Sequence, residues 1–129
     1  IDQGSNYKPL YDLDLSLKEK IETIAKEIYG ADGVAFDGAA AKELAHIEEM
    51  GYGKMPVCIA KTPVSFSDDP SKLGAPSGFT LHVREVKVSA GAGFVVALTG
   101  KIMTMPGLPR RPAAERIDVD DEGNITGLF

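Results

Sequence analysis

The chain has 129 residues and a formal net charge of −5, from 14 Lys and Arg against 19 Asp and Glu. With 43% hydrophobic and 26% charged residues, the composition is that of one ordinary globular domain, which excludes disorder, collagen-like repeats and disulfide scaffolds. The acidic balance argues against a groove for phosphate backbones, and no apolar stretch approaches the length of a membrane span. We therefore expect neither nucleic acid nor a membrane as a partner.

The single cysteine, Cys58, lies in an apolar run and cannot form an internal disulfide. A thiol in such a run behaves as a small hydrophobe, so we expect a reducing, cytoplasmic compartment. The N-terminus has neither the basic start nor the apolar core of a signal peptide. Because the sequence begins at Ile1 rather than Met, we expect it to be a piece of a longer chain.

Residues 16–29 carry the clearest local signal, an amphipathic helix with defined ends. Ser16 and Glu19 form an S-x-x-E capping box, in which each side chain accepts a hydrogen bond from a backbone N–H near the other. Five apolar residues at helical spacing predict one buried stripe: Leu17, Ile21, Ile24, Ala25 and Ile28. Gly30 ends the helix, because glycine adopts left-handed backbone angles without steric cost.

A short strand over residues 33–36 and a second helix over about residues 38–50 come next. The helix is expected to bury three residues and to end at the following glycine; they are Leu44, Ile47 and Met50. An unbroken apolar run over residues 57–60, bounded by prolines, predicts a buried strand. The Pro and Gly of residues 63–78 predict a long loop, and such loops are usually functional or held against a partner.

Two further strands are predicted after this loop. Apolar and polar residues alternate over residues 79–83, but the next apolar pair, Val86 and Val88, is one residue out of phase. The slip predicts a β-bulge, or the end of one strand, at residues 84–85. A second apolar run over residues 94–98 can pair with this strand.

The end of the chain predicts a rigid loop followed by a small hairpin. Residues 103–112 read MTMPGLPRRP, whose three prolines exclude regular structure. The acidic turn between residues 117 and 125 imitates the opening of an EF-hand calcium loop, but Phe129 stands where the twelfth ligand, a carboxylate, is required. We therefore expect an exposed acidic turn in a hairpin, and no metal site.

No phosphate-binding or zinc motif is found in the sequence. Gly100-Lys101 lacks the Ser or Thr that follows in a P-loop, and Val95 stands where the first glycine is needed. His46 and His82 have no ligand partners at zinc spacing, so each is expected on a surface, His82 on the polar face of a strand.

Lys61 and Thr62 are the best-placed polar pair. They directly follow the strand predicted over residues 57–60, and ligands gather at strand ends in α/β and α+β proteins.

Several motifs resemble the C-terminal end of formate–tetrahydrofolate ligase, also called formyltetrahydrofolate synthetase. The similarity is most specific at PVCIAKT, SAGAGF and MTMPGLP, includes KEKIETIAKEIYGADGV upstream, and continues to Phe129. This family makes 10-formyltetrahydrofolate from formate, ATP and tetrahydrofolate: formate is phosphorylated, and the folate amine then attacks the formyl phosphate. The phosphate-binding loop of the family belongs to an N-terminal part that these 129 residues do not include.

The resemblance implies an α+β fold: a small mixed or largely antiparallel sheet with two main helices, forming the C-terminal part of a larger α/β ligase. Residues 1–129 are then one domain, and residues from about 103 to 129 are a tail that returns to the missing main body. Because phosphoryl transfer needs a P-loop, basic side chains and Mg²⁺, we expect this fragment alone to be inactive, structural and cleft-shaping. ATP and Mg²⁺ are expected to bind mainly outside it, with no cofactor in the fragment.

The implied partners are the rest of the same ligase chain and the substrates tetrahydrofolate and formate, and the complete enzyme is expected to be a homo-oligomer. Met103, Thr104 and Met105 are expected to line the nucleotide or folate cleft, with Lys61 and Thr62 as further substrate-binding residues. No catalytic or metal-binding residue is expected. A rigid connector is the other interpretation of the MTMPGLP loop. For the whole chain, the alternative is a free-standing, non-catalytic interaction or scaffold module with the same fold.

Overall fold

The computed structural model describes residues 4, 6–100, 102 and 110–127. The elements are helix α1 (Leu17–Glu27), strand β1 (Gly33–Phe36), helix α2 (Gly38–Ile47), a π-helical turn (Glu48–Tyr52), strands β2 (Val57–Ala60), β3 (Thr80–Ser89) and β4 (Phe94–Thr99), a 3-10 helix (Ala113–Glu115), and strands β5 (Asp118–Val119) and β6 (Ile125–Thr126). The predicted α+β class is confirmed. No helix within the described residues has the length and apolar character needed to cross a membrane.

Strands β1 to β4 form one sheet in the order β1-β3-β4-β2. β1 runs parallel to β3, β2 runs parallel to β4, and the central pair of β3 and β4 is antiparallel. The sheet is therefore mixed, which was the first of the two expected types. The register between β3 and β4 shifts between Val83 and Glu85, as the slip in the apolar pattern predicted. β5 and β6 form the expected small hairpin.

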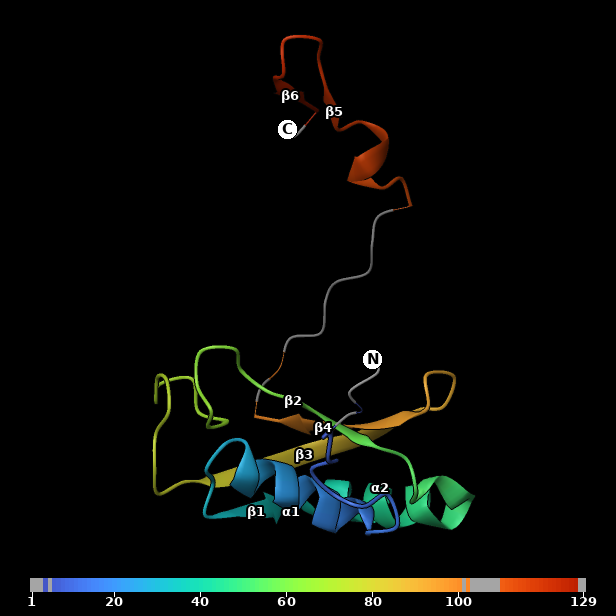
Figure 1. The fold of residues 1–129 in the computed structure, drawn as a ribbon, viewed down its shortest axis with the longest axis vertical. Coiled ribbons are helices and arrows are strands. Elements are labelled where there is room, and N and C mark those ends of the chain that lie inside the picture. Colours follow the sequence, from blue (N-terminus) through green and yellow to red (C-terminus); the bar gives the residue numbers. More distant parts are fainter. Residues whose placement is uncertain (1–3, 5, 101, 103–109, 128–129) are drawn as a thin grey trace.

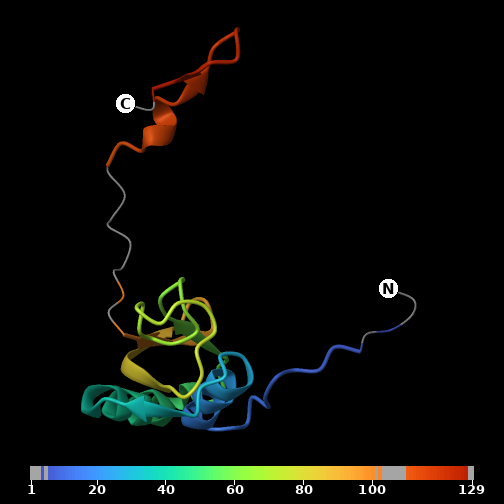
Figure 2. The ribbon, with the colours of Figure 1, turned by 90° about the vertical axis from the view of Figure 1, so that its left-hand side faces the viewer.

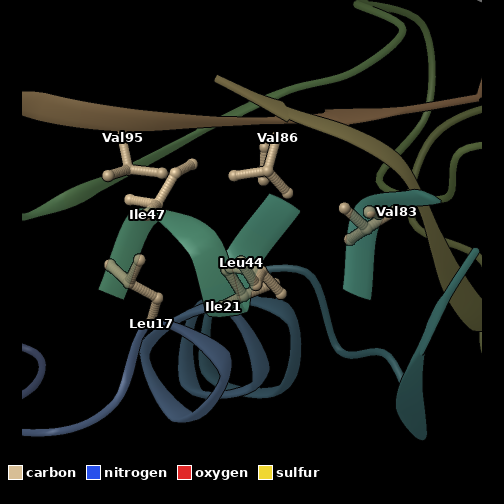
Figure 3. Close-up of a cluster of buried hydrophobic side chains, with 9 residues drawn as sticks. Leu17, Ile21, Leu44, Ile47, Val83, Val86 and Val95 are labelled. Atoms are coloured by element: carbon tan, nitrogen blue, oxygen red, sulfur yellow. The ribbon is translucent and has the colours of Figure 1, made fainter. Parts of the chain in front are cut away.

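Both helices cover the same face of the four-stranded sheet, and the loop of residues 61–78 lies on the other side (Figures 1 and 2). The main core fills the space between the helices and the sheet (Figure 3), with Leu17 and Ile21 from α1, Leu44 and Ile47 from α2, and Val83, Val86 and Val95 from the strands. We call the side that the helices leave free the open face, and the 61–78 loop crosses part of it. By strand alternation it carries Cys58 and Ala60 of β2, His82 and Arg84 of β3, and Phe94 and Val96 of β4.

Helix α1 begins as predicted but ends earlier. The backbone N–H of Glu19 donates to Ser16 Oγ (3.3 Å) and that of Ser16 donates to Glu19 Oε2 (2.9 Å), so the capping box is present. The helix ends at Glu27, and Gly30, with φ of 69°, turns the chain away. Because of this turn Ile28 is 52% exposed, and its predicted place in the buried stripe was wrong; Ile24 is half-buried.

Helix α2 buries Leu44 and Ile47, but Met50 is 46% exposed, so its predicted burial was wrong. The α-helix ends at Ile47, and the wider π-helical turn that follows rotates Met50 off the apolar face. Cys58, expected in a buried strand, is also exposed, because it lies on the open face of the edge strand β2.

Lys20, which the sequence pattern did not single out, is fully buried in the face of α1 that meets the core. Its Nζ donates hydrogen bonds to the carbonyls of Gly53 (2.7 Å) and Met55 (3.1 Å). Burial lowers the pKa of the Lys20 ammonium, and the nearby carboxylates of Asp14 and Glu48 act against this shift. Lys20 thus joins α1 to the chain just before β2.

Replacing Lys20 tests this attachment. Lys20→Met keeps the buried apolar stem but leaves two carbonyls without their donor, so we expect the free energy of unfolding to fall by about 1–3 kcal/mol. Lys18→Met on the wet side of the same helix is the matched control and should change it by less than about 0.5 kcal/mol. Urea denaturation measures both. Equal stability of the two variants would contradict a structural role for Lys20.

Candidate functional site

The parallel strands β2 and β4 end side by side, and Thr99 Oγ1 donates to the carbonyl of Ala60 (3.2 Å) at this end of the sheet. A cavity of about 450 Å³, here called the strand-end cavity, lies there; it is lined by Lys61, Thr62, Pro63, Asp68, Pro70, Thr99 and Ile102. The carboxyl ends of parallel strands are common ligand sites, because the connections that leave them enclose a crevice. Lys61 and Thr62 follow a strand, as predicted, and both line this cavity.

Met103, Thr104 and Met105 lie outside the described residues. Ile102, which directly precedes them, lines the strand-end cavity together with Lys61 and Thr62. Ala60 and Thr99, the last residues of β2 and β4, lie at this same end of the sheet.

The ammonium of Lys61 is held by the backbone of the loop that follows it. Its Nζ donates to the carbonyls of Thr62 (2.9 Å) and Ser65. The same Nζ lies 5.1 Å from the centre of the Tyr29 ring and 6.0 Å from that of Phe66. Burial lowers the pKa of Lys61, and the charge of Asp68 partly offsets the effect. Lys61 therefore fixes the start of the 61–78 loop.

A second cavity, of about 400 Å³, lies beside the strand-end cavity and shares Lys61, Thr62 and Pro63 with it. Tyr29 and Phe66 also line it, with their ring centres 6.0 Å apart. Sequence reasoning missed both aromatic residues. They come from the turn after α1 and from the loop, and no spacing in the sequence links them.

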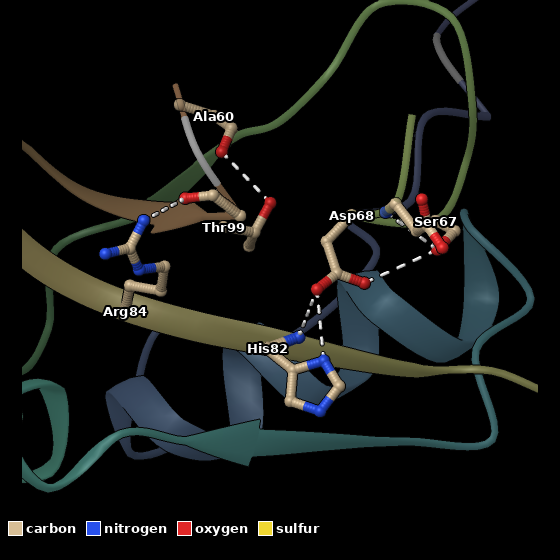
Figure 4. Close-up of polar contacts among 8 residues, drawn as sticks. Ala60, Ser67, Asp68, His82, Arg84 and Thr99 are labelled. Carbon is tan, nitrogen blue, oxygen red and sulfur yellow. Dashed lines mark hydrogen bonds and ion pairs between the residues drawn. The ribbon is translucent and has the colours of Figure 1, made fainter. Parts of the chain in front are cut away.

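Asp68 holds the 61–78 loop on the open face of the sheet (Figure 4). Its Oδ2 lies 3.0 Å from His82 Nδ1 and accepts the backbone N–H of His82 at 3.4 Å. Its Oδ1 accepts the Ser67 hydroxyl at 3.4 Å. Arg84, on the same face of β3, donates from Nη1 to the carbonyl of Gly100 (3.2 Å), as Figure 4 also shows.

The location of His82 agrees with the expected exposed strand position, since its side chain is 55% exposed. Its partner Asp68, whose side chain is only 14% exposed, was not foreseen. The contact joins a loop to a strand across 14 residues, and neither residue belongs to a local motif.

Within the described part of the chain, no three His, Cys, Asp or Glu side chains are grouped so that they could hold a metal ion. In the hairpin, Asp120 Oδ1 accepts the backbone N–H groups of Asn124 (2.8 Å) and Glu122 (3.0 Å). These bonds, those from Asn124 above all, lower the pKa of Asp120. Its carboxylate therefore shapes the turn, an Asx-type arrangement.

The fold and the cavity define a small α+β module, with helices on one face of a mixed sheet and a cavity where two parallel strands end. The family model of formate–tetrahydrofolate ligase matches residues 1–129. The chain belongs to this family, and the resemblance seen in its motifs is confirmed.

Two curated relatives match along the whole chain. The formate–tetrahydrofolate ligase of Symbiobacterium thermophilum is 63% identical over 129 residues, and that of Paenarthrobacter aurescens is 59% identical over the same length. The alignment covers 100% of this chain and 23% of each relative. The chain therefore spans about a quarter of the length of these ligases.

Gly100 tests how closely the 61–78 loop packs against the residue that follows β4. Its φ is +63°, and a Cβ there would lie 2.8 Å from the carbonyl oxygen of Asp68, whereas Gly93, with φ of +76°, has nothing within 4 Å. Alanine at either position strains the backbone by about 1–2 kcal/mol. Only Gly100→Ala also displaces Asp68. We therefore expect it to lower the free energy of unfolding more than Gly93→Ala does, and to speed limited proteolysis within residues 61–78. If Gly93→Ala had the same two effects, the close approach of Asp68 would be unimportant.

Proposed function

We propose that residues 1–129 are part of an ATP-dependent formate–tetrahydrofolate ligase and form one wall of its substrate cleft. The observation that carries the proposal is the strand-end cavity, which lies between Lys61, Thr62 and Ile102 in a chain that matches this family over its whole length. The segment itself is structural and shapes the cleft. The remainder of the polypeptide supplies the chemistry of phosphoryl transfer.

The division of labour follows from the chemistry of the reaction. Joining a carboxylate to an amine at the expense of ATP requires phosphate positioning by a P-loop, basic side chains and Mg²⁺. Residues 1–129 contain no P-loop sequence. ATP and Mg²⁺ therefore bind mainly to the rest of the ligase chain, and this segment alone is inactive.

The open face of the sheet supports a position at a cleft. β2 and β4 are apolar on both faces over almost their whole length, with Cys58 of one strand opposite Val96 of the other. Parallel strands of this kind usually have both faces covered, and here the helices cover only one. β3 adds the charged or polar side chains of His82 and Arg84. A surface that is half apolar and half polar suits a substrate with an aromatic ring system and charged groups, such as tetrahydrofolate.

The rest of the ligase chain is the proposed partner of the ends of this segment. Tyr7, Leu10 and Leu13 are 81%, 45% and 49% exposed, which is an apolar surface of the kind that marks an interface. We place residues from about 103 to 129 as a tail against the main body of the ligase. The complete enzyme is proposed to be a homo-oligomer.

The full-length protein tests this function. It should form 10-formyltetrahydrofolate from formate, ATP and tetrahydrofolate, and the 129-residue segment alone should form none.

Met103, Thr104 and Met105 are proposed to line the cleft beside Lys61 and Thr62. We therefore expect Met105→Ala in the full-length protein to raise the KM for ATP or tetrahydrofolate several-fold at unchanged thermal stability, because a soft side chain against an aromatic ring is lost.

Met50→Ala is the matched control, since Met50 is exposed on the helix side of the sheet and should leave the kinetics unchanged. A loss of stability with normal kinetics in Met105→Ala would make the MTMPGLP loop a connector. A full-length protein without formylation activity would favour a scaffold module, and turnover by the isolated segment would contradict the division of labour.

A further inference from the structure

We propose that His82 is a catalytic residue that accepts the proton lost by the tetrahydrofolate amine during its formylation. The inference rests on the proposed function, and it assigns to this segment a chemical role beyond shaping the cleft. Three observations support it: the orientation of the imidazole by Asp68, the place of Asp68 in the wall of the strand-end cavity, and the accessibility of the second ring nitrogen.

The reaction needs a base at the attacking nitrogen. The lone pair of the amine forms a new N–C bond to the carbon of formyl phosphate, and the C–O bond to phosphate breaks with its electron pair leaving on the phosphate. The nitrogen then carries one proton too many, which must pass to an acceptor. A positioned side chain that takes this proton typically accelerates such a step by about 10²–10⁴-fold.

Asp68 prepares His82 for this task. With Asp68 Oδ2 only 3.0 Å from His82 Nδ1, the neutral imidazole carries its proton on Nδ1 and donates it to the carboxylate. The lone pair is thereby placed on Nε2. A carboxylate that fixes the tautomer and orientation of a histidine is the arrangement by which enzymes hold a general base.

The position of Asp68 is the second observation. Asp68 is itself a wall of the strand-end cavity, with Lys61 and Thr62, and its side chain is only 14% exposed. His82 lies on the open face, and its side chain is 55% exposed. Among the described residues, Nε2 has no hydrogen-bonding partner, so it is accessible to a substrate in the cleft.

His46 serves as an internal comparison. It belongs to α2, one of the two helices that cover the other face of the sheet, and its side chain is 69% exposed, with Nδ1 4.0 Å from Glu49 Oε2. His46 is therefore also near a carboxylate, but its partner Glu49 lines neither cavity at the end of β2, whereas Asp68, the partner of His82, lines the strand-end cavity.

The test uses the full-length ligase and separates proton transfer from the structural contact with Asp68. His82→Asn places an amide N–H where Nδ1 was, so the contact with Asp68 can persist while the Nε2 position is lost. His82→Ala removes both. We expect kcat for formylation to fall about 100-fold in both variants. The thermal midpoint of His82→Asn should stay close to that of the unmodified protein. Added imidazole should restore part of the rate of His82→Ala, and His46→Asn should behave as the unmodified protein.

Each other outcome overturns the inference. A normal kcat in His82→Asn would show that His82 only anchors the loop. A raised KM at unchanged kcat in both variants would make it a binding residue. Failure of imidazole to restore any rate in His82→Ala would exclude proton transfer at this position. Failure of the proposed function is distinguishable from these outcomes, because the unmodified full-length protein would then form no 10-formyltetrahydrofolate.

Discussion

The buried ammonium of Lys20 is the contact on which the arrangement of this domain depends. It lies in the apolar face of α1 and binds the carbonyls of Gly53 and Met55, which end the connection from α2. Glu48 reinforces the joint by accepting the backbone N–H of Leu17 at 2.8 Å. A buried polar group is tolerated only when its hydrogen bonds are satisfied, so this junction permits one relative position of α1 and the chain that enters β2.

A second lysine, Lys61, holds the chain by similar hydrogen bonds at the other end of β2. Lys61 binds the carbonyls of Thr62 and Ser65 and packs against Tyr29, which ties the outgoing loop to the end of α1. β2 has only four residues and lies at the edge of the sheet, where a strand has a neighbour on one side only. Donors at both of its ends fix the strand, and with it the cavity where β2 and β4 end. Stability and the proposed site therefore depend on the same strand.

Local chemistry explains what the sequence could predict. The capping box, the bulge after Val83 and the hairpin turn each depend on residues within a few positions of one another, and all three are present. Ile28 and Met50 were misplaced because a helical pattern does not reveal where the helix stops or widens. Lys61 and Thr62 could be placed at a strand end from the sequence, because a strand boundary is also a local property.

The long-range contacts could not be predicted in this way. In the sequence Lys20 is one more polar residue of a helix, because its partners, the carbonyls of Gly53 and Met55, are more than 30 positions away. The pairing of Asp68 with His82 depends on how a long loop returns to the sheet, and its composition does not determine that path. The identity of the family was accessible from the sequence only through resemblance, since no catalytic motif lies in these 129 residues.

The central claim is that the end of the β2–β4 pair, with the loop of residues 61–78, forms a wall of the substrate cleft. Hydrogen–deuterium exchange of the full-length ligase, with and without ATP and tetrahydrofolate, measures this most directly. We expect slower exchange on substrate addition in residues 61–78 and at the end of β4, with exchange in β1 and α2 unchanged. Unchanged exchange at the 61–78 loop and the end of β4, with protection confined to the rest of the ligase, would contradict it.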